Sequence, residues 1–502
     1  MWQGFVQLKI KKHTGLVGLV RIIELAGTSY LKAGQHMRKT KIICTIGPET
    51  ASYIMLKTMA EQGMDIVRLN MSHGTHEWHA KVIDHVKRLN RKEGSGIAIL
   101  LDTKGPEIRT GDVSRDIVLK KGDGFIFTVR RQPVLEPDCV EVSYDGFVDD
   151  VAVGDTILVD GGMLSFKVEQ ITGLDVHCSA LDDGLLGSRR HLNVRGKSAD
   201  LPSITEKDWQ DIIFGVERGI DFVALSFVRQ ADAIVELQEF LHKRLARVDV
   251  IAKIESAEAI PHLDEIIEVA GGVMIARGDL GAELPFEEVP HLQEEIAATC
   301  RTAGKPVIVA THMLESMIVN PTPTRAEVSD ITQAVLQQVD CTMLSGETTT
   351  GKYPLKAIEV MDTVARRTEE RQKLSPKIQV ARSDNAKYEI ARSATILNNN
   401  LKAKAILVFT RRGLMVVLVS RCRPISSIYA FTNTSHVRRR LGLYWGVQSF
   451  NVKFSTSPEV TIGRAVSMLK EQQRVHTGDR VIVVSDIFVD GTYIETVQVR
   501  VI

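Results

Sequence analysis

Acidic side chains stand at the ends of apolar runs in this sequence. Residues 271–281, GGVMIARGDLG, form a glycine-bounded apolar stretch that is typical of a strand buried on both faces, and its charged end holds Asp279. Glu255 ends the preceding apolar run, VDVIAKIES. Two carboxylates at neighbouring strand ends are hard oxygen ligands that suit a divalent cation such as Mg²⁺, which keeps positions open for substrate oxygens. We therefore predict a magnesium site at Glu255 and Asp279.

Basic and neutral polar side chains follow the apolar runs in the same way. Arg68 and Lys253 are suited to hold phosphate oxygens, and a lysine acts as a point charge on a phosphoryl group in transfer. Neutral oxygens beside one carboxylate suit a weakly held monovalent cation, and four residues offer them: Asn70, Ser72, Asp102 and Thr103. A metal site, a cation site and phosphate-binding bases together indicate phosphoryl transfer.

Eight strand-length apolar runs carry these residues, and helix-length stretches such as 209–217 and 231–241 separate most of them. Eight strand–helix units predict an α/β fold with a closed (β/α)8 TIM barrel, in which the active site lies where the strands end. A Rossmann-type open sheet is the competing fold, but it requires an early G-x-G-x-x-G loop that this sequence lacks. The runs are KIICTIGP, DIVRLNMSHG, GIAILLDTKGPEIRTG, DFVALSFV, VDVIAKIES, GGVMIARGDLG, PVIVATHMLES and CTMLSGET.

The long interval between the third and fourth runs differs in pattern from the rest. Residues 110–198 alternate apolar and polar positions between Gly/Asp turns, which predicts a small antiparallel β-barrel inserted as a lid. The catalytic barrel then comprises 38–109 and 199–375. After the charged stretch RRTEERQKLSPK, residues 376–502 predict a separate α/β sheet domain.

The bulk composition narrows the class of protein. The 502 residues are 44% hydrophobic and 25% charged with a net charge of +1, so no global field favours nucleic acid or membranes. The six cysteines include no C-x-x-C pair, which is typical of reduced thiols in an intracellular, non-secreted protein. The basic run at 436–440, HVRRR, lacks interleaved aromatic residues, and we interpret it as solvent-exposed surface.

The first 37 residues do not decide the cellular compartment of the protein. They hold five basic residues and one acid, as a transit peptide would, but they are poorer in serine than such peptides are. A plastid stroma location follows if residues 1–37 are a transit peptide. If instead the native start is Met37, a cytoplasmic location follows.

The motifs KTKIICTIGP, LDTKGPEIRTG, MIARGDLGAELP and PTPTRAEVSD resemble those of the pyruvate kinase family, and the resemblance extends from residue 39 to about 502. The run SRRHLNVRGKSADLPSITEKDW is similar to plant plastid-type members. The resemblance implies a barrel, an inserted lid and a C-terminal regulatory domain in a homo- or hetero-tetramer. It also implies phosphoenolpyruvate and ADP/ATP as partners, with Mg²⁺ (or Mn²⁺) and K⁺ as cofactors.

The resemblance also implies a role for each residue that matches a functional position of the family. Glu255 and Asp279 match the family's magnesium ligands, and Lys253 matches the lysine that neutralises the phosphoryl group as it moves. Arg68 matches the arginine that binds this group. Gly278 lets backbone N–H approach the substrate carboxylate, and Thr311 matches the threonine on the proton route from enolate to pyruvate.

The cation and nucleotide positions transfer in the same manner. Asn70, Ser72, Asp102 and Thr103 match the potassium ligands, and Glu107 matches the glutamate of potassium-dependent members. The positions that match nucleotide contacts are Asn70, His73, Arg109 and Arg190, the last standing where a lysine is usual.

The sequence departs from the family pattern at two places, and two rival functions remain. Residues 191–196 read HLNVRG where the lid run G-V-N-L-P-G is usual, and the effector loop at 410–415, TRRGLM, lacks most of the hydroxyls that cradle a sugar bisphosphate. One rival is another magnesium-dependent barrel enzyme that forms an enolate, such as a lyase. The other is a catalytically weak regulatory subunit of a hetero-oligomer.

Overall fold

The computed structural model describes residues 37–132, 134, 136–195, 201–371, 385–489 and 492–502. All of the predicted extension 1–37 except Met37, and two of the predicted boundaries, at 198/199 and at 375/376, therefore fall outside the described residues. Within the described ranges, no helix is both long enough and apolar enough to cross a membrane.

The predicted (β/α)8 barrel is confirmed. Eight strands close in the order β1-β17-β16-β15-β14-β13-β3-β2, and every neighbouring pair is parallel. Each of the eight apolar runs supplies one strand. The bounds are β1 (Lys41–Thr45), β2 (Ile66–Asn70), β3 (Ala98–Asp102), β13 (Phe222–Leu225), β14 (Asp249–Ile254), β15 (Gly272–Ala276), β16 (Val307–Ala310) and β17 (Cys341–Leu344).

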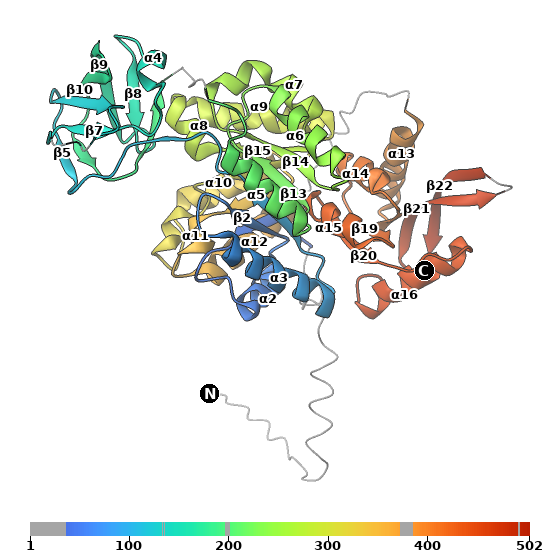
Figure 1. Cartoon of the computed structure of the whole chain (residues 1–502). Helices are drawn as coiled ribbons and strands as arrows, with labels where there is room; N and C mark the ends of the chain where they lie inside the picture. The colour runs from blue at the N-terminus through green and yellow to red at the C-terminus, as the bar shows by residue number, and fades with distance from the viewer. Residues whose placement is uncertain (1–36, 133, 135, 196–200, 372–384, 490–491) are drawn as a thin grey trace, which may run out of the picture. The chain divides into compact units, whose positions relative to one another are not determined.

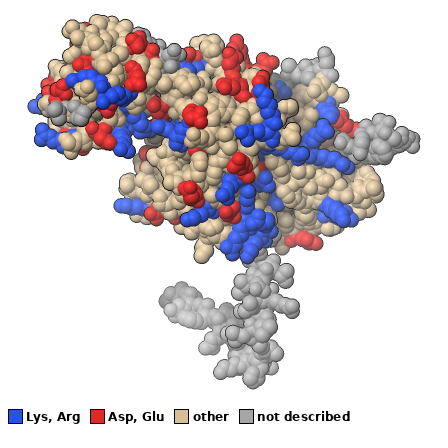
Figure 2. Space-filling model, in the orientation of Figure 1, with Lys and Arg blue, Asp and Glu red and all other residues tan. Residues whose placement is uncertain are grey.

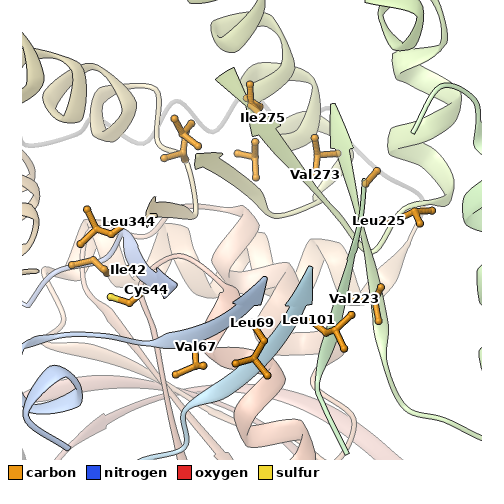
Figure 3. Close-up of a cluster of buried hydrophobic side chains, with 14 of the residues drawn as sticks. Ile42, Cys44, Val67, Leu69, Leu101, Val223, Leu225, Val273, Ile275 and Leu344 are labelled. Atoms are coloured by element: carbon orange, nitrogen blue, oxygen red, sulfur yellow. The ribbon is translucent and has the colours of Figure 1, made fainter. Parts of the chain in front are cut away.

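Burial on both faces explains why these strands are apolar throughout. Ile43, Leu100 and Met274 belong to a cluster that fills the barrel interior. Alternate residues such as Ile42 and Leu101 point the other way, into the layer shared with the surrounding helices (Figure 3). The main outer helices are α2 (Tyr53–Gln62), α3 (His76–Lys92), α5 (Glu206–Glu217), α6 (Ala231–Lys243), α7 (Leu263–Val269), α9 (Glu288–Ala303), α10 (Arg325–Leu336) and α12 (Pro354–Arg371).

The inserted segment is an independent curled sheet of seven strands, in the order β4-β12-β8-β9-β10-β6-β7. Thr110, which follows edge strand β4, forms an isolated antiparallel bridge with Val142, which follows the other edge strand, β7. Its own core includes Phe125, Phe127 and Phe166, with ring centroids 5.0–5.3 Å apart. The strands are β4 (Ile108–Arg109), β6 (Gly124–Thr128), β7 (Cys139–Glu141), β8 (Thr156–Val159), β9 (Leu164–Thr172), β10 (Asp175–Ala180) and β12 (His191–Val194), with a separate pair β5 (Ile117–Leu119) and β11 (Gly184–Leu186).

The C-terminal region forms a third α/β unit around a five-stranded sheet, in the order β20-β19-β18-β21-β22. Only β22 runs antiparallel, and it pairs with β21 along its full length (Figure 1). The strands are β18 (Ala405–Phe409), β19 (Ser427–Thr432), β20 (Val447–Asn451), β21 (Arg480–Val489) and β22 (Thr492–Val501), and the helices are α13 (Ala386–Leu401), α14 (Leu414–Arg421), α15 (Ser435–Arg440) and α16 (Pro458–Glu471).

The basic run at 436–440, interpreted from the sequence as surface and not as a nucleic-acid patch, is partly buried against the barrel. Arg439 in α15 donates from Nε to both carboxylate oxygens of Asp221, at 2.9 and 3.0 Å, and Arg440 donates to Asp249 at 2.5 Å. Both acids lie where barrel strands begin, so the run contacts the barrel at the end opposite to the strand termini that hold the candidate site. Elsewhere, Figure 2 shows Lys and Arg interspersed with Asp and Glu over the face drawn.

Candidate active site

The polar residues predicted at strand ends gather at one end of the barrel. All eight strands are parallel, so their carboxyl ends point the same way, which is where barrel enzymes carry their chemistry. Arg68 and Asp102 lie on neighbouring strands β2 and β3, while Lys253 lies near the end of β14 and Glu255 just beyond it.

A chain of buried ion pairs joins four of these side chains. The Nε of Arg68 lies 2.6 Å from Oδ2 of Asp102, and the Nζ of Lys253 lies 2.9 Å from Oδ1 of the same carboxylate. Lys253 also lies 2.8 Å from Oε1 of Glu255. Burial alone would raise the pKa of Asp102 and lower the pKa of Lys253. The neighbouring opposite charges outweigh burial at both groups, so the pKa of Asp102 is lowered and the pKa of Lys253 is raised. Both groups are held in their charged forms.

Glu255 and Asp279 form a second, acid-rich part of the site. Burial, with help from the nearby charge of Asp279, raises the pKa of Glu255 to about 7 against the opposing pull of Lys253. Burial also raises the pKa of Asp279. A buried and an adjoining half-buried carboxyl group need more positive charge than Lys253 alone supplies, and a divalent cation fits that need.

No group of three His, Cys, Asp or Glu that could hold a metal occurs among the residues with described positions. Glu255 and Asp279 are the two acidic residues that would hold a divalent cation here, and a pair of carboxylates suits a cation that also takes substrate oxygens and water.

Gly278 and Thr311 meet beside Asp279. Gly278 lies in α8 (Arg277–Glu283), and its N–H donates to Oγ1 of Thr311 at 2.7 Å, while that hydroxyl donates to the carbonyl of Ala310 at 2.6 Å. Thr311 has a φ of 66°, which is strained for a β-branched residue and typical of functional sites. Arg277 contacts the carbonyl of Thr311 at 2.6 Å, so it supports this loop.

The candidate cation ligands come from two paired strands. Asn70 and Asp102 are register partners at the ends of β2 and β3. Oδ1 of Asn70 accepts from the N–H of Ser72 at 3.1 Å, and Oγ1 of Thr103 accepts from the N–H of Ser226 at 3.0 Å. The structure thus brings together the two loops that carry these four residues.

The candidate nucleotide residues are more dispersed. His73 is exposed in the loop after β2. Arg109 donates to Glu107 at 2.8 Å where the chain enters the inserted sheet. Arg190 contacts Asp160 at 3.3 Å within that sheet, and none of its described contacts reaches the Lys253 ion pairs.

Two residues absent from the sequence-based site complete the network. Ser226 accepts from Lys253 Nζ at 2.7 Å and donates to the carbonyl of Thr103 at 2.7 Å, and Thr45 accepts from Arg68 at 3.0 Å. Ser226 directly follows the strand in the run DFVALSFV, and Thr45 ends the strand in the run KIICTIGP. Their position at a strand end is the signal that could have identified them.

Comparison with known proteins shows the family to which the chain belongs. A family model described as "Pyruvate kinase, barrel domain" matches residues 37–358, and one described as "Pyruvate kinase, alpha/beta domain" matches residues 388–499. Plastidial pyruvate kinase 2 of Arabidopsis thaliana is 52% identical over 451 residues, which cover 89% of this chain and 78% of the relative. Pyruvate kinase of Geobacillus stearothermophilus is 40% identical over 466 residues, covering 91% and 78% respectively.

A solved structure gives the same result in three dimensions. The crystal structure of a pyruvate kinase from Cryptosporidium parvum superposes with a TM-score of 0.86 at 34% identity, covering 92% of this chain and 96% of that one. The barrel, the inserted sheet, the C-terminal α/β unit and the sequence matches all agree, and the chain belongs to the pyruvate kinase family.

Proposed function

We propose that this chain transfers the phosphoryl group of phosphoenolpyruvate to ADP, giving pyruvate and ATP in the last step of glycolysis. The observation that supports this best is the placement of Lys253 between Asp102 and Glu255 at 2.9 and 2.8 Å. A buried lysine held in its charged form at a barrel's strand ends is suited to neutralise a phosphoryl group in transfer.

The remaining substrate contacts are assigned to Arg68, Gly278 and Thr311. Arg68 presents its guanidinium to the phosphoryl oxygens. We assign the substrate carboxylate to the Gly278 N–H and the Thr311 hydroxyl, and their mutual hydrogen bond, which brings the two groups together, supports this assignment. In this position Thr311 takes part in the proton transfer that converts the enolate to pyruvate.

Glu255 and Asp279 would hold Mg²⁺ or Mn²⁺, which supplies positive charge to the substrate oxygens when bound. Asn70, Ser72, Asp102 and Thr103 would hold K⁺. Both assignments use the oxygen donors that these cations prefer.

For the nucleotide, we assign contacts to Asn70, His73, Arg109 and Arg190. Arg190 lies within the predicted lid, and Arg109 lies in edge strand β4 at its border, so their contribution requires that residues 110–198 act as a lid that excludes water from the reacting groups. The catalytic barrel would then comprise 38–109 and 199–375, and residues 376–502 would form the regulatory domain.

Assembly follows from the family, and compartment follows from the relatives. We propose a homo- or hetero-tetramer because the family resemblance implies one; no relative's name bears on assembly. The plastidial names of the relatives favour the plastid stroma over the cytoplasm, with residues 1–37 as a targeting extension. A catalytically weak regulatory subunit is less favoured, because every predicted catalytic position holds the expected residue type.

The test is pyruvate formation from phosphoenolpyruvate and ADP by the purified chain from Met37 onward, with Mg²⁺, in potassium and then in sodium buffer. Activity in potassium that collapses in sodium is the expected result. A folded sample with no turnover in either buffer would favour the regulatory-subunit alternative.

A further inference from the structure

Two consecutive residues of α5 hold both loops of the candidate potassium site. Lys207 and Asp208 lie in the first turn of this helix, directly after the chain returns from the inserted sheet. Neither belongs to the set of ligands assigned above. Each contacts a different loop.

Asp208 is buried and holds the loop after β3. Its Oδ1 accepts from the backbone N–H groups of Lys104 and Gly105, both at 3.0 Å. These residues directly follow Thr103 in the chain. Only glycine fits at position 105, because its φ is 75° and a Cβ there would come within 2.7 Å of the Ser226 side chain.

The other oxygen of Asp208 faces the chain that returns from the lid. Its Oδ2 accepts from the backbone N–H of Thr205 at 3.0 Å and from the Thr205 hydroxyl at 2.6 Å. One carboxylate therefore joins the segment that leaves the barrel for the inserted sheet to the segment that comes back. A cap that served only α5 would not need the two bonds to Lys104 and Gly105.

Lys207 holds the loop after β2. Its Nζ donates to the carbonyl of Met71 at 2.9 Å, between Asn70 and Ser72 in the chain. Asp211, one turn along α5, accepts from Lys207 Nζ at 2.5 Å and from His76 Nε2 at 2.6 Å. The ring of His76 stacks on Phe214 with centroids 4.3 Å apart, which fixes this support in turn.

We propose that Lys207 and Asp208 are positioning residues that set the geometry of the potassium site, by holding its two loops against the base of the lid. The inference rests on the proposed potassium site. It assigns to the start of α5 a role in cation affinity and in selectivity for K⁺ over Na⁺.

The test compares Asp208→Asn, Lys207→Met and two control variants in the full chain from Met37. Thr205→Ala weakens the same helix cap without losing a bond to the loop after β3, and Glu206→Gln removes an exposed charge from the same turn. Two readouts are needed: the K⁺ concentration for half-maximal activity, and the K⁺-dependent rise in melting temperature without substrates, with Na⁺ replacing K⁺ at constant ionic strength.

We expect Asp208→Asn to raise the half-saturating K⁺ concentration about tenfold or more, as loss of an outer-shell partner of a metal site does. Lys207→Met should act in the same direction, and both variants should lose the stabilisation by K⁺. The two controls should keep wild-type K⁺ responses, even where Thr205→Ala lowers the melting temperature.

Unchanged K⁺ responses in both test variants would overturn the inference and leave Asp208 as a helix cap. Because Lys207→Met leaves the cap intact, it decides the question if Asp208→Asn does not fold. A wild-type chain that turns over equally well in sodium and is not stabilised by K⁺ would overturn the proposed potassium site, and this inference with it.

Discussion

The Nζ of Lys253 lies 2.9 Å from Oδ1 of Asp102, with 9% of the lysine side chain and none of the aspartate side chain exposed to solvent. The pair couples the end of β14 to the end of β3. Neither residue can be changed without leaving the other buried and short of countercharge.

Replacing Lys253 with methionine should abolish phosphoryl transfer, with kcat falling by roughly 10³-fold or more, because a preorganised charge at the reacting group is lost. The same change leaves Glu255 without its lysine partner and Asp102 with Arg68 alone, and it should lower the free energy of unfolding by about 3–5 kcal/mol. Steady-state kinetics and urea unfolding measure the two effects. Ser226→Ala is the control, since it removes the hydrogen bonds of a neutral hydroxyl to Lys253 and to the Thr103 carbonyl but leaves the charge of Lys253 in place. Near-normal kcat in Lys253→Met would contradict the assigned role.

Thr311→Ala should lower kcat by about 10²-fold while Thr311→Ser retains most activity, because the hydroxyl and not the methyl group contacts the Gly278 N–H. Both variants should bind Mg²⁺ as the wild type does, since Thr311 is not one of the proposed magnesium ligands. Pyruvate release assays with magnesium titrations separate the two properties. Equal losses in the two variants would indicate that Thr311 acts only through its strained backbone.

Glu107→Lys should make activity independent of potassium, with the ratio of rates in K⁺ and Na⁺ falling toward one. The added ammonium group would supply a fixed cation near the site. Glu107→Gln is the matched control, because it removes the charge that Arg109 contacts at 2.8 Å but supplies no cation, and it should stay potassium-dependent. A Glu107→Lys variant that still requires K⁺ would argue against the Asn70/Ser72/Asp102/Thr103 site.

Arg439→Met should destabilise the protein more at neutral than at acidic pH. Burial raises the pKa of Asp221 above its ordinary value of 3.8 although Arg439 opposes the rise, so the folded state binds more protons than the unfolded chain above that pH. By linkage, the contribution of this carboxyl group to stability falls as pH rises through its folded pKa, and loss of Arg439 raises that pKa further.

We expect the Arg439→Met deficit in unfolding free energy to reach about 3 kcal/mol at neutral pH, as for a broken buried pair, and to shrink toward pH 5. Arg440→Met is the control: the carboxylate of its partner Asp249 is 24% exposed, so the loss should be about 1 kcal/mol or less. Urea unfolding across this pH range measures both. A deficit that does not change with pH would show that Arg439 acts by packing alone.

The sequence alone determined the barrel and most of the candidate site. Parallel strands buried on both faces must be continuously apolar, so each appeared as a distinct run, and a barrel can present chemistry only where such runs end. Lys253, Glu255 and Asp279 were identifiable for this reason. The family motifs added their roles.

Tertiary structure decided which distant groups meet. Ser226 and Thr45 complete the network, Asp208 joins two loops, and Arg439 docks on Asp221, although nothing in the local pattern around any of them specifies its partner. The physical reason is that apolar periodicity reports which face of an element is buried. The register between strands and the packing of helix termini, which choose the partner, depend on contacts between segments far apart in the chain.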